Sequence, residues 1–472
     1  MAGTYTQGQH KDLSGVYSTI QAVREANEQG TRGIVAYPFT SDWGPVNVLT
    51  DVSRDTQFDT LFNGSKTALT AKRIYNHAFR GNPYIVLAYR MASTSAKVAS
   101  ITLTDGAGTP ATSLIIDTLY PTTRPFVARV IDTLSGGKRI EFTENGSEIA
   151  NVEGSSVVEL REAIDATNYF RVRTAGANLP ANNAGVTFAG GHNGQDITAS
   201  QHLAFRTEIE ADGRAKAIAM DDYTDAAEVA TYESWLMRAR ANGAYITFVN
   251  GGPASWETNQ DVAHVVSREY NNRSIVNVAM GVDGYPPSEI ALFIAARVAS
   301  VALNRSITDE TIPYDKVNKK LTPDQRIAAK RAGTLVLVQN GDTVEIDEGV
   351  NTFTVVNDPE NEREEFGKIR VSNTLDQIAA DTEKFGQAYK KNKNNTVEAR
   401  VAYGAAITTE YFGPMITQEV LHPGATYAPD PEWHGENAAY TPKIDEAYFA
   451  STIQPIDSME KIYQKFNVSF SA

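Results

Sequence analysis

The chain has 472 residues and no cysteine, and its 57 acidic and 43 basic side chains give a formal net charge of −14. The lack of cysteine excludes disulfides, thiolate metal sites and cysteine nucleophiles. The negative charge disfavours binding to nucleic acid and to anionic lipid, and it makes copies of the chain repel one another unless short-range pairing overcomes that repulsion.

The length predicts about three domains, at roughly 100–200 residues per domain. The longest apolar stretch, residues 290–303, is shorter than the roughly 20 residues that span a bilayer. The polar first residues show no secretory signal. We therefore expect no direct insertion into a membrane.

The first 91 residues divide into an arm and a small segment. Residues 1–20 are polar and end in a β-prone run from residue 15 to 20, which predicts an N-terminal arm. Residues 21–91 are predicted to form a small α/β segment. Its expected elements are strands at 33–37 and 84–90 and a helix around 65–78.

Residues 92–191 have a β-rich pattern. Short runs of Val, Ile and Thr alternate with turns that contain Gly and Asn. Such regular short strands are typical of a β-sandwich or barrel. The predicted strands span residues 98–104, 111–116, 126–133, 139–144, 156–160 and 169–173.

Residues 192–321 alternate between helices and short apolar strands. Because the strands carry apolar residues on both faces, we expect a parallel sheet covered by helices. The predicted helices are 198–210, 226–242, 259–270 and 288–303, and the predicted strands are 215–220, 244–249 and 274–280.

Residues 322–456 are predicted to form an α+β C-terminal domain. Pro323 begins a helix that Gly333 ends, and a hairpin from residue 334 to 345 turns at Asn340-Gly341. Asn373 or Thr374 caps the next predicted helix, which is followed by a helix at 397–412. Residues 423–442 are rich in proline and predict a loop, and residues 457–472 form a final strand-like segment.

The sequence shows no motif for catalysis or for a cofactor. A phosphate-binding loop, a dinucleotide fingerprint and a nucleophile elbow are all missing, and the seven histidines are scattered without metal-ligand spacing. We therefore expect no enzyme activity, no cofactor and no metal. A remote alternative is an α/β hydrolytic enzyme with a β-rich accessory domain, which would need a triad within residues 196–317, where His202 and His264 are the histidines.

Two charged clusters stand out. The acidic run at residues 358–365 lacks the pattern of a calcium loop and predicts a solvated turn. The basic cluster at the end of the helix near residue 390 has two interpretations that the sequence leaves open. It complements the helix dipole, or it faces an acidic partner. Its members are Lys384, Lys390, Lys391 and Lys393.

The two chain ends both look like strands that lie outside a packed domain. A lone strand has unpaired main-chain groups, so it must join a sheet edge in its own chain or in a neighbour. Two such strands would let copies link head to tail, which gives rings or helical polymers. The apolar residues of these strands are Val16, Tyr17 and Ile20 at one end, and Ile462, Phe466, Val468 and Phe470 at the other.

Segments spread over nearly the whole chain match a known family in order and spacing. They are residues 13–17 (LSGVY), 32–36 (RGIVA), 43–45 (WGP), 188–194 (FAGGHNG), 304–308 (NRSIT), 349–353 (GVNTF) and 456–463 (IDSMEKIY). In these segments the chain resembles the contractile, myovirus-type phage tail sheath family. The resemblance is to the branch of Gram-positive prophage and phage-tail-like bacteriocin sheaths.

The resemblance implies a multidomain α/β and α+β fold. It has a central subtilisin-like domain without protease activity, an inserted β-sandwich and a C-terminal domain nearest the tail tube. In the family, subunits form stacked six-fold rings around the tube, and exchanged terminal strands complete a neighbour's sheet. The implied partners are other copies, the tube protein, and baseplate and tail terminator proteins, after synthesis in the bacterial host cytoplasm.

Carried over to this sequence, residues 15–20 and 461–470 become the linking strands, and the four lysines become a candidate tube contact. The implied function is contraction that drives the tube through a bacterial envelope. The alternative within the family is the sheath of a bacteriocin or another contractile injection device.

Overall fold

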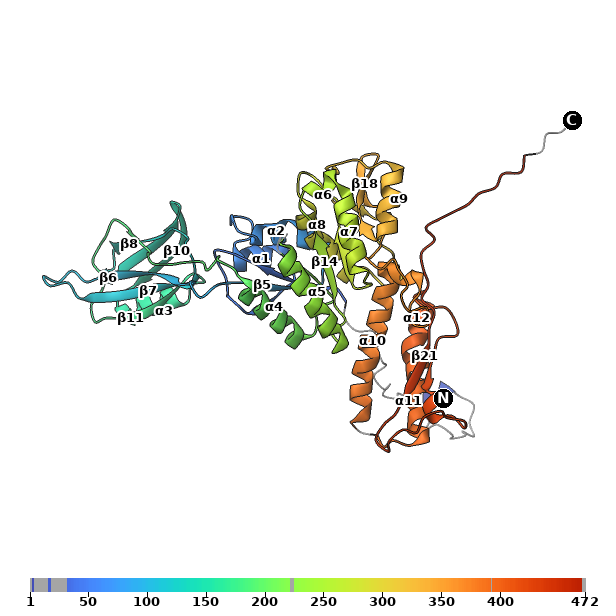
Figure 1. Ribbon diagram of the computed structural model, residues 1–472. Coiled ribbons are helices and arrows are strands. Elements are labelled where there is room, and N and C mark those ends of the chain that lie inside the picture. The colour runs from blue at the N-terminus through green and yellow to red at the C-terminus, as the bar shows by residue number, and fades with distance from the viewer. Residues whose placement is uncertain (1, 4–15, 18–31, 221–224, 392, 469–472) are drawn as a thin grey trace. The chain divides into compact units, whose positions relative to one another are not determined.

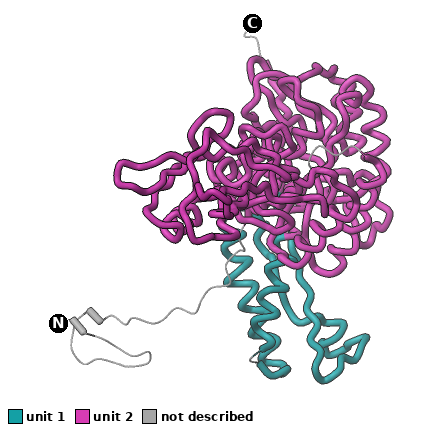
Figure 2. The backbone as a smooth tube through the Cα atoms, turned by 90° about the vertical axis from the view of Figure 1, so that its left-hand side faces the viewer, with its two compact units in different colours: residues 1–30, 377–456 teal, residues 31–376, 457–472 magenta. Residues whose placement is uncertain are grey.

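A computed structural model describes residues 2–3, 16–17, 32–220, 225–391 and 393–468 (Figure 1). The chain forms two compact units (Figure 2). Unit 1 comprises residues 1–30 and 377–456, and unit 2 comprises residues 31–376 and 457–472. The fold is a mixed α/β multidomain fold, as the sequence predicts.

Unit 2 is built on a seven-stranded sheet in the order β17-β15-β14-β13-β3-β5-β4. Adjacent strands are parallel except β4, which pairs antiparallel with β5. The strands are β3 (Ile34–Phe39), β4 (Leu49–Val52), β5 (Ile85–Arg90), β13 (Ala217–Ala219), β14 (Thr247–Gly251), β15 (Ile275–Val278) and β17 (Thr334–Leu335).

Both faces of this sheet are buried. Along β3, Val35, Tyr37 and Phe39 belong to one hydrophobic cluster, whereas Ile34 and Ala36 belong to another on the opposite face. Successive side chains of a strand point to opposite faces, so helices must cover both. One cluster includes α1 (Asp55–Phe62), α2 (Ala71–His77) and α8 (Pro287–Ser300), and the other includes α4 (Ala199–Asp212) and α5 (Ala226–Ala241).

The remaining helices of this region are α6 (Ser255–Thr258), α7 (Gln260–Tyr270) and α9 (Pro323–Ala332), with a 3-10 turn at Ala78–Gly81. The predicted alternation of helices and covered parallel strands is confirmed. The predicted helix at 65–78 is shorter in the structure, because α2 begins only at Ala71. No helix of the described residues is long and apolar enough to cross a lipid bilayer.

Residues 98–187 form two antiparallel sheets that share one hydrophobic core. Phe126, Phe142, Phe170 and Phe188 pack in the core with ring centroids 4.2–6.4 Å apart. One sheet has the order β10-β9-β8-β12 and the other β11-β7-β6. The strands are β6 (Val98–Thr104), β7 (Thr112–Pro121), β8 (Phe126–Asp132), β9 (Lys138–Glu144), β10 (Ser147–Gly154), β11 (Phe170–Ala175) and β12 (Val186–Thr187).

The strand predicted at residues 156–160 is wrong, because these residues begin the helix α3 (Val157–Asp165). The Ser156 hydroxyl accepts a hydrogen bond from the Glu159 amide at 3.2 Å, and the Glu159 carboxylate accepts one from the Ser155 amide at 2.8 Å. This cap satisfies amides at the start of the helix and outweighs the β preference of the two valines that follow. The strand β10 was not predicted.

The hairpin predicted at Asn340-Gly341 is confirmed, with strands β18 (Leu337–Asn340) and β19 (Thr343–Ile346). The short strand β16 (Thr311–Ile312) pairs with β19 on its other side. Thr334 and Leu335 are not part of the hairpin, because they form β17 of the large sheet. Gly333 ends α9 in a left-handed conformation with φ 67°, as predicted.

The helix α10 (Ile369–Lys390) begins in unit 2 and continues into unit 1. The predicted cap at Asn373 or Thr374 is wrong, since both residues lie inside the helix and are buried. The Asn373 amide group donates to the Val298 carbonyl at 3.0 Å, and the Thr374 hydroxyl donates to the Arg370 carbonyl at 3.0 Å. Tertiary packing therefore satisfies side chains whose type alone favours a cap.

Unit 1 continues with α11 (Val397–Ala406), a π-helical turn (Ile407–Phe412) and α12 (Gly413–Thr417), as predicted for residues 397–412. The stretch predicted as a loop contains a strand, β20 (Thr426–Pro429), and a short helix, α13 (Pro431–His434). The strand β21 (Phe449–Thr452) pairs with β20, and β1 (Ala2–Gly3) pairs with β2 (Val16–Tyr17).

We expect Ser156→Ala to weaken α3, since the loss of an N-cap side chain destabilises a helix by about 1 kcal/mol. Hydrogen–deuterium exchange of residues 157–165 should become roughly fivefold faster. Ser147→Ala, an exposed serine at the start of β10, is the control and should exchange as the unchanged chain does. Equal exchange in both variants would contradict the capping role.

His202 on α4 is expected to make the stability of the fold depend on pH. It is buried, and its Nδ1 lies 2.9 Å from the Tyr232 hydroxyl. Burial lowers the pKa of His202, while the Glu228 carboxylate opposes and Arg206 reinforces that shift. The unfolded chain therefore takes up this proton first, near its ordinary pKa of about 6.5. The stability from this neutral histidine is complete above that pKa and declines as the pH falls toward the folded-state value.

We expect His202→Gln to reduce the loss of stability between about pH 7 and pH 5, because glutamine does not titrate. Chemical denaturation followed by tryptophan fluorescence measures the midpoint at each pH. The variant should have a lower midpoint at pH 7 but a shallower decline. A decline as steep as that of the unchanged chain would show that His202 does not carry this dependence.

Candidate functional site

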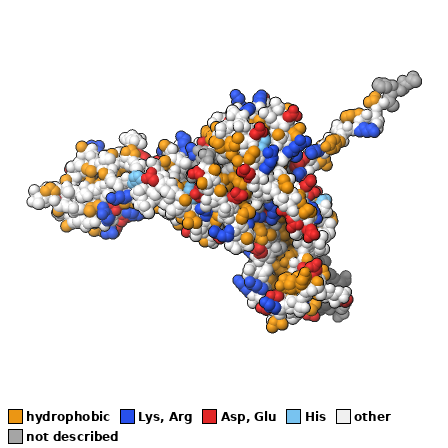
Figure 3. All heavy atoms as spheres, viewed as in Figure 1, with side chains coloured by type: hydrophobic (Ala, Val, Ile, Leu, Met, Phe, Trp, Pro, Cys, Tyr) orange, Lys and Arg blue, Asp and Glu red, His pale blue; other side chains and the backbone are white. Residues whose placement is uncertain are grey.

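The C-terminal segment is exposed and has no regular structure. Residues 457–468 form neither helix nor strand, and residues 461–468 are all exposed. In Figure 1 it runs out from the fold, and Figure 3 shows hydrophobic and basic side chains along it. Its large apolar side chains are Met459, Ile462, Tyr463, Phe466 and Val468, which are 70–90% exposed.

The predicted strand at 461–470 is therefore not formed in the single chain, as far as its residues are described, and Phe470 lies outside the described residues. No hydrogen bond or ion pair joins residues 461–468 to another described residue. Exposed aromatic side chains on an unpaired backbone are typical of segments that bind a partner.

At the N-terminal end, the structure pairs Val16 and Tyr17 with Ala2 and Gly3 in a parallel two-residue ladder of the same chain. This sheet has only these two strands among the described residues, so the other edge of β2 is unpaired there. The side chains of Val16 and Tyr17, and the whole of Ile20, lie outside what the structure describes.

The sheet of β20 and β21 is a candidate acceptor for such a strand. It has two antiparallel strands in the described part of the chain, with Thr426 opposite Thr452 and Pro429 opposite Phe449. The Thr408 hydroxyl bonds both main-chain groups of Tyr427 on the outer edge of β20, so the outer edge of β21 is the one without a partner among the described residues. A two-stranded sheet is marginal alone and needs packing against another element. Here α11 supplies it, since a Cβ at Gly404 would lie 2.7 Å from the Tyr427 carbonyl oxygen.

The four candidate lysines lie at the end of α10 and just beyond it. All four are exposed, and none forms an ion pair with another described residue. Lys390 and Lys393 line a groove of about 490 Å³ in unit 1 between α10, α11 and β21. The structure brings these two together at the groove, while Lys384 and Lys391 do not line it.

Aromatic side chains that the sequence analysis missed line the same groove. The rings of Tyr389 and Tyr403 pack at a tilt of 34° with centroids 4.6 Å apart, and the ring centroid of Phe449 lies 5.1 Å from that of Tyr403. The Lys393 ammonium lies 5.8 Å from the Tyr389 ring centroid. Burial raises the pKa of Tyr403. These residues come from three separate elements, so no local sequence signal brings them together.

The histidines of the remote hydrolase alternative have structural partners. His202 contacts the Tyr232 hydroxyl, and the Nδ1 of His264 lies 3.0 Å from the Thr334 hydroxyl. Burial lowers the pKa of both histidines. Among the described residues, no group of three or more His, Asp or Glu side chains could hold a metal ion.

The acidic run at residues 358–365 contains the predicted turn at residues 359–361, and its last two residues begin a 3-10 helix (Glu364–Gly367). The Glu362 carboxylate accepts hydrogen bonds from the amides of Asn357 at 2.8 Å and Asp358 at 3.1 Å. A hydrogen bond from Asn361 lowers the pKa of Asp358. The carboxylates of Asp358 and Glu362 thus accept hydrogen bonds from neighbouring residues of the same loop.

The comparisons with known proteins point to one family. The family model for the phage tail sheath protein central domain matches residues 195–352. No curated protein matches the chain by sequence.

Solved structures share the fold over nearly the whole chain. A sheath tail protein from Desulfitobacterium hafniense has a TM-score of 0.68 at 18% identity, with 94% of this chain and 100% of that chain covered. A sheath tail protein from Listeria innocua has a TM-score of 0.68 at 20% identity, with 92% and 94% covered. The helical sheath of the anti-feeding prophage in its contracted state has a TM-score of 0.56 at 11% identity, with 97% and 99% covered.

The residues that match the family model, 195–352, contain β13, β14, β15 and β17 of the seven-stranded sheet in unit 2. The similarity to solved structures covers residues of both units. The resemblance found in the sequence is therefore confirmed. Residues 195–352 match the family model of the phage tail sheath central domain, and the fold of nearly the whole chain is similar to that of two sheath tail proteins.

Proposed function

We propose that this chain is the structural subunit of a contractile tail sheath, in a phage or in a phage-like injection device. It polymerises as stacked six-fold rings around an inner tube, and its contraction drives the tube through a bacterial envelope. The single observation that carries the assembly mechanism is the exposed part of the C-terminal segment, residues 461–468, which makes no hydrogen bond or ion pair with another described residue.

The domain organisation proposed for this function follows the sequence boundaries. Residues 92–191 form a β-sandwich, residues 192–321 a non-catalytic domain of subtilisin-like fold, and residues 322–456 the domain nearest the tube. Residues 1–20 and 457–472 are linking arms, and residues 21–91 complete the central part. The shared core of the two antiparallel sheets and the covered parallel sheet support the first two assignments.

The linking strands add to a sheet of an adjacent copy. In an extended conformation, Ile462, Phe466 and Val468 share one face of the C-terminal segment with Phe470, because side chains of a strand alternate. The outer edge of β21 offers main-chain partners for such a strand. Linkage of this kind joins each copy to the next without closing a dimer, as a ring or helical polymer requires.

Contraction then proceeds by rigid-body rotation of subunits about the arms. The arms keep their main-chain hydrogen bonds throughout, since the loss of each would forfeit about 1 kcal/mol. The favourable change comes from new contacts between the outer parts of neighbouring subunits.

The basic end of α10 contacts the tail tube. The groove beside it combines the cations of Lys390 and Lys393 with aromatic side chains, a surface that suits an acidic partner with an apolar side chain. Baseplate and tail terminator proteins contact the ends of the polymer. The subunit is made in the host cytoplasm, works without a cofactor and catalyses no reaction, which agrees with the structural partners of His202 and His264.

We expect a chain lacking residues 461–472 to fold and to remain monomeric, because the segment that links copies is gone. Phe466→Asp should act in the same way by placing a charge on the linking face. Asn467→Asp is the matched control on the opposite face and should still polymerise. Electron microscopy distinguishes tubes from monomers, and tubes formed by the truncated chain would rule out this mechanism.

The double substitution Lys390→Glu and Lys391→Glu should prevent assembly on the tube and spare polymerisation without the tube, because it reverses the charge that faces the partner. Lys316→Glu with Lys320→Glu makes the same change of charge at exposed sites of unit 2. This control should assemble on the tube normally. Co-sedimentation with tubes measures both, and normal assembly of the α10 variant would remove the tube contact.

A further inference from the structure

The first residues of the C-terminal segment are bound, although the rest is exposed. The chain is still part of unit 1 at Ile456, whose amide donates to the Val420 carbonyl at 2.9 Å. From Asp457 onward it belongs to unit 2. Within unit 2, side chains hold residues 457–460, and residues 461–468 make no hydrogen bond or ion pair with other described residues.

Lys368, the residue before α10, is the centre of this attachment. Its ammonium group donates to the Glu460 carboxylate at 2.7 Å and forms an ion pair with the Asp457 carboxylate. Burial acts to lower the pKa of Lys368, but hydrogen bonds to Asp457 and Glu460 outweigh it and raise the pKa above its usual value. The lysine is therefore charged at neutral pH, and it bridges two carboxylates of the segment.

The second oxygen of Glu460 is also used. The Thr308 hydroxyl donates to Glu460 Oε1 at 3.1 Å and accepts a hydrogen bond from the Gly349 amide at 2.9 Å. The Ser458 hydroxyl donates to the same oxygen at 3.1 Å. The Glu460 side chain is only 12% exposed. Thr308, Lys368, Asp457 and Glu460 together are called the clasp below.

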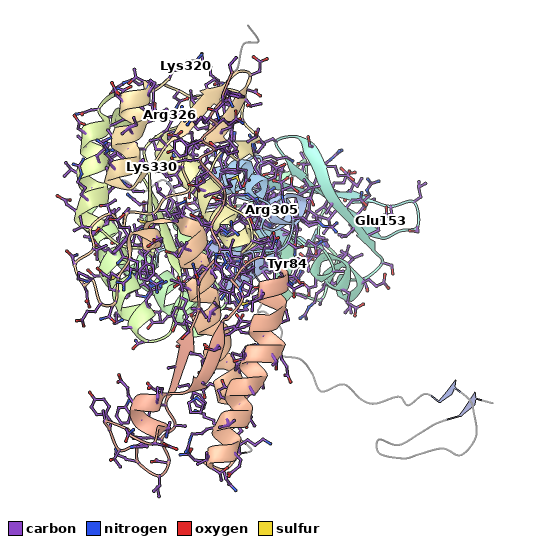
Figure 4. All side chains as sticks on the ribbon, turned by 90° about the vertical axis from the view of Figure 1, so that its right-hand side faces the viewer. Tyr84, Glu153, Arg305, Lys320, Arg326 and Lys330 are labelled. Carbon is purple, nitrogen blue, oxygen red and sulfur yellow. The ribbon has the colours of Figure 1, made fainter. Side chains whose placement is uncertain are left out.

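The carboxylate of Asp309 lies near enough to the clasp to feel the charge of Glu460. Burial raises the pKa of Asp309, and the negative charges of Glu345, Asp347 and Glu460 add to that shift, while Arg326 opposes it. Arg326, which is labelled in Figure 4, itself pairs with Asp347. Without Lys368, Glu460 would therefore lie near a group of like charges and would be repelled from its place.

We propose that Lys368 is a positioning residue for assembly, because the clasp fixes the point on unit 2 from which the linking segment starts. This inference rests on the proposed linkage of copies through residues 461–470. A fixed starting point confines the segment to a smaller volume and raises its effective concentration at the acceptor edge. Release of residues 457–460 would add roughly 13 Å of reach, at about 3.3 Å per residue, and would disperse the segment.

The absence of cysteine allows a direct distance measurement. Spin labels on Val262→Cys in α7 and Met459→Cys, both exposed positions, report the spread of distances between unit 2 and the clasped residues. Below the concentration of polymerisation, we expect a narrow distribution for the unchanged clasp, a broad one for Lys368→Met, and a broader one for Lys368→Glu.

Lys330→Met is the matched control. Lys330 lies on α9 (Figure 4) and pairs with Glu348, and its side chain is 34% exposed, against 29% for Lys368. The Lys330→Met substitution removes an ion pair of similar exposure in the same unit, and this pair does not contact the C-terminal segment. The distribution of spin-label distances should therefore stay narrow. Lys368→Arg, and the exchange of charges in Lys368→Glu with Glu460→Lys, should restore a narrow distribution.

The assembly readout separates this inference from the proposed function. We expect Lys368→Met to form tubes only at roughly tenfold higher protein concentration, because linkage must then order the freed residues. A narrow distribution and unchanged assembly in both Lys368→Met and Lys368→Glu would overturn the clasp and leave the linkage intact. Tubes from the chain lacking residues 461–472 would overturn the linkage itself, whatever the distances show.

Discussion

The main-chain groups of a strand need partners, and this constraint connects the ends of the chain to its assembly. Water satisfies these groups in an exposed segment, but exposed aromatic side chains such as Tyr463 and Phe466 gain nothing from water. Addition to a sheet edge satisfies the backbone and buries the side chains in one step. The two-stranded β20–β21 sheet has the complementary need, since narrow sheets are marginal until they are widened or packed.

The proposed contraction by rotation of subunits requires rigid bodies between the linking strands. The covered parallel sheet of unit 2 supplies one, because nearly all residues of α8 are buried and both faces of β3 lie in separate clusters. Closely packed cores move as units instead of deforming continuously. In the proposed polymer, a change of shape is therefore concentrated in the connections between such bodies.

The sequence predicts those parts of the fold whose signal is local. Apolar runs indicated β3, β14 and β15, and Pro323 and Gly333 marked both ends of α9. The strand predicted at residues 156–160 was wrong because two valines suggested a strand, whereas Ser156 and Glu159 cap a helix. The cap predicted at Asn373 was wrong because the partner of its side chain, the Val298 carbonyl, is 75 residues away in the sequence. The same reason hides the clasp and the aromatic groove, since Lys368 and Glu460 are separated by 92 residues.

The charge of the chain divides its lysines into two kinds. A net charge of −14 makes copies repel, and salt reduces that repulsion over distances of about 10 Å. Lys368 is held by two carboxylates of its own chain, so its charge is neutralised within the subunit. Lys384, Lys390 and Lys391, in contrast, have no ion-pair partner among the described residues. Main-chain linkage does not depend on charge, so salt that weakens a lysine contact with an acidic partner also favours the joining of copies. Opposite responses to salt thus follow from the same acidic composition.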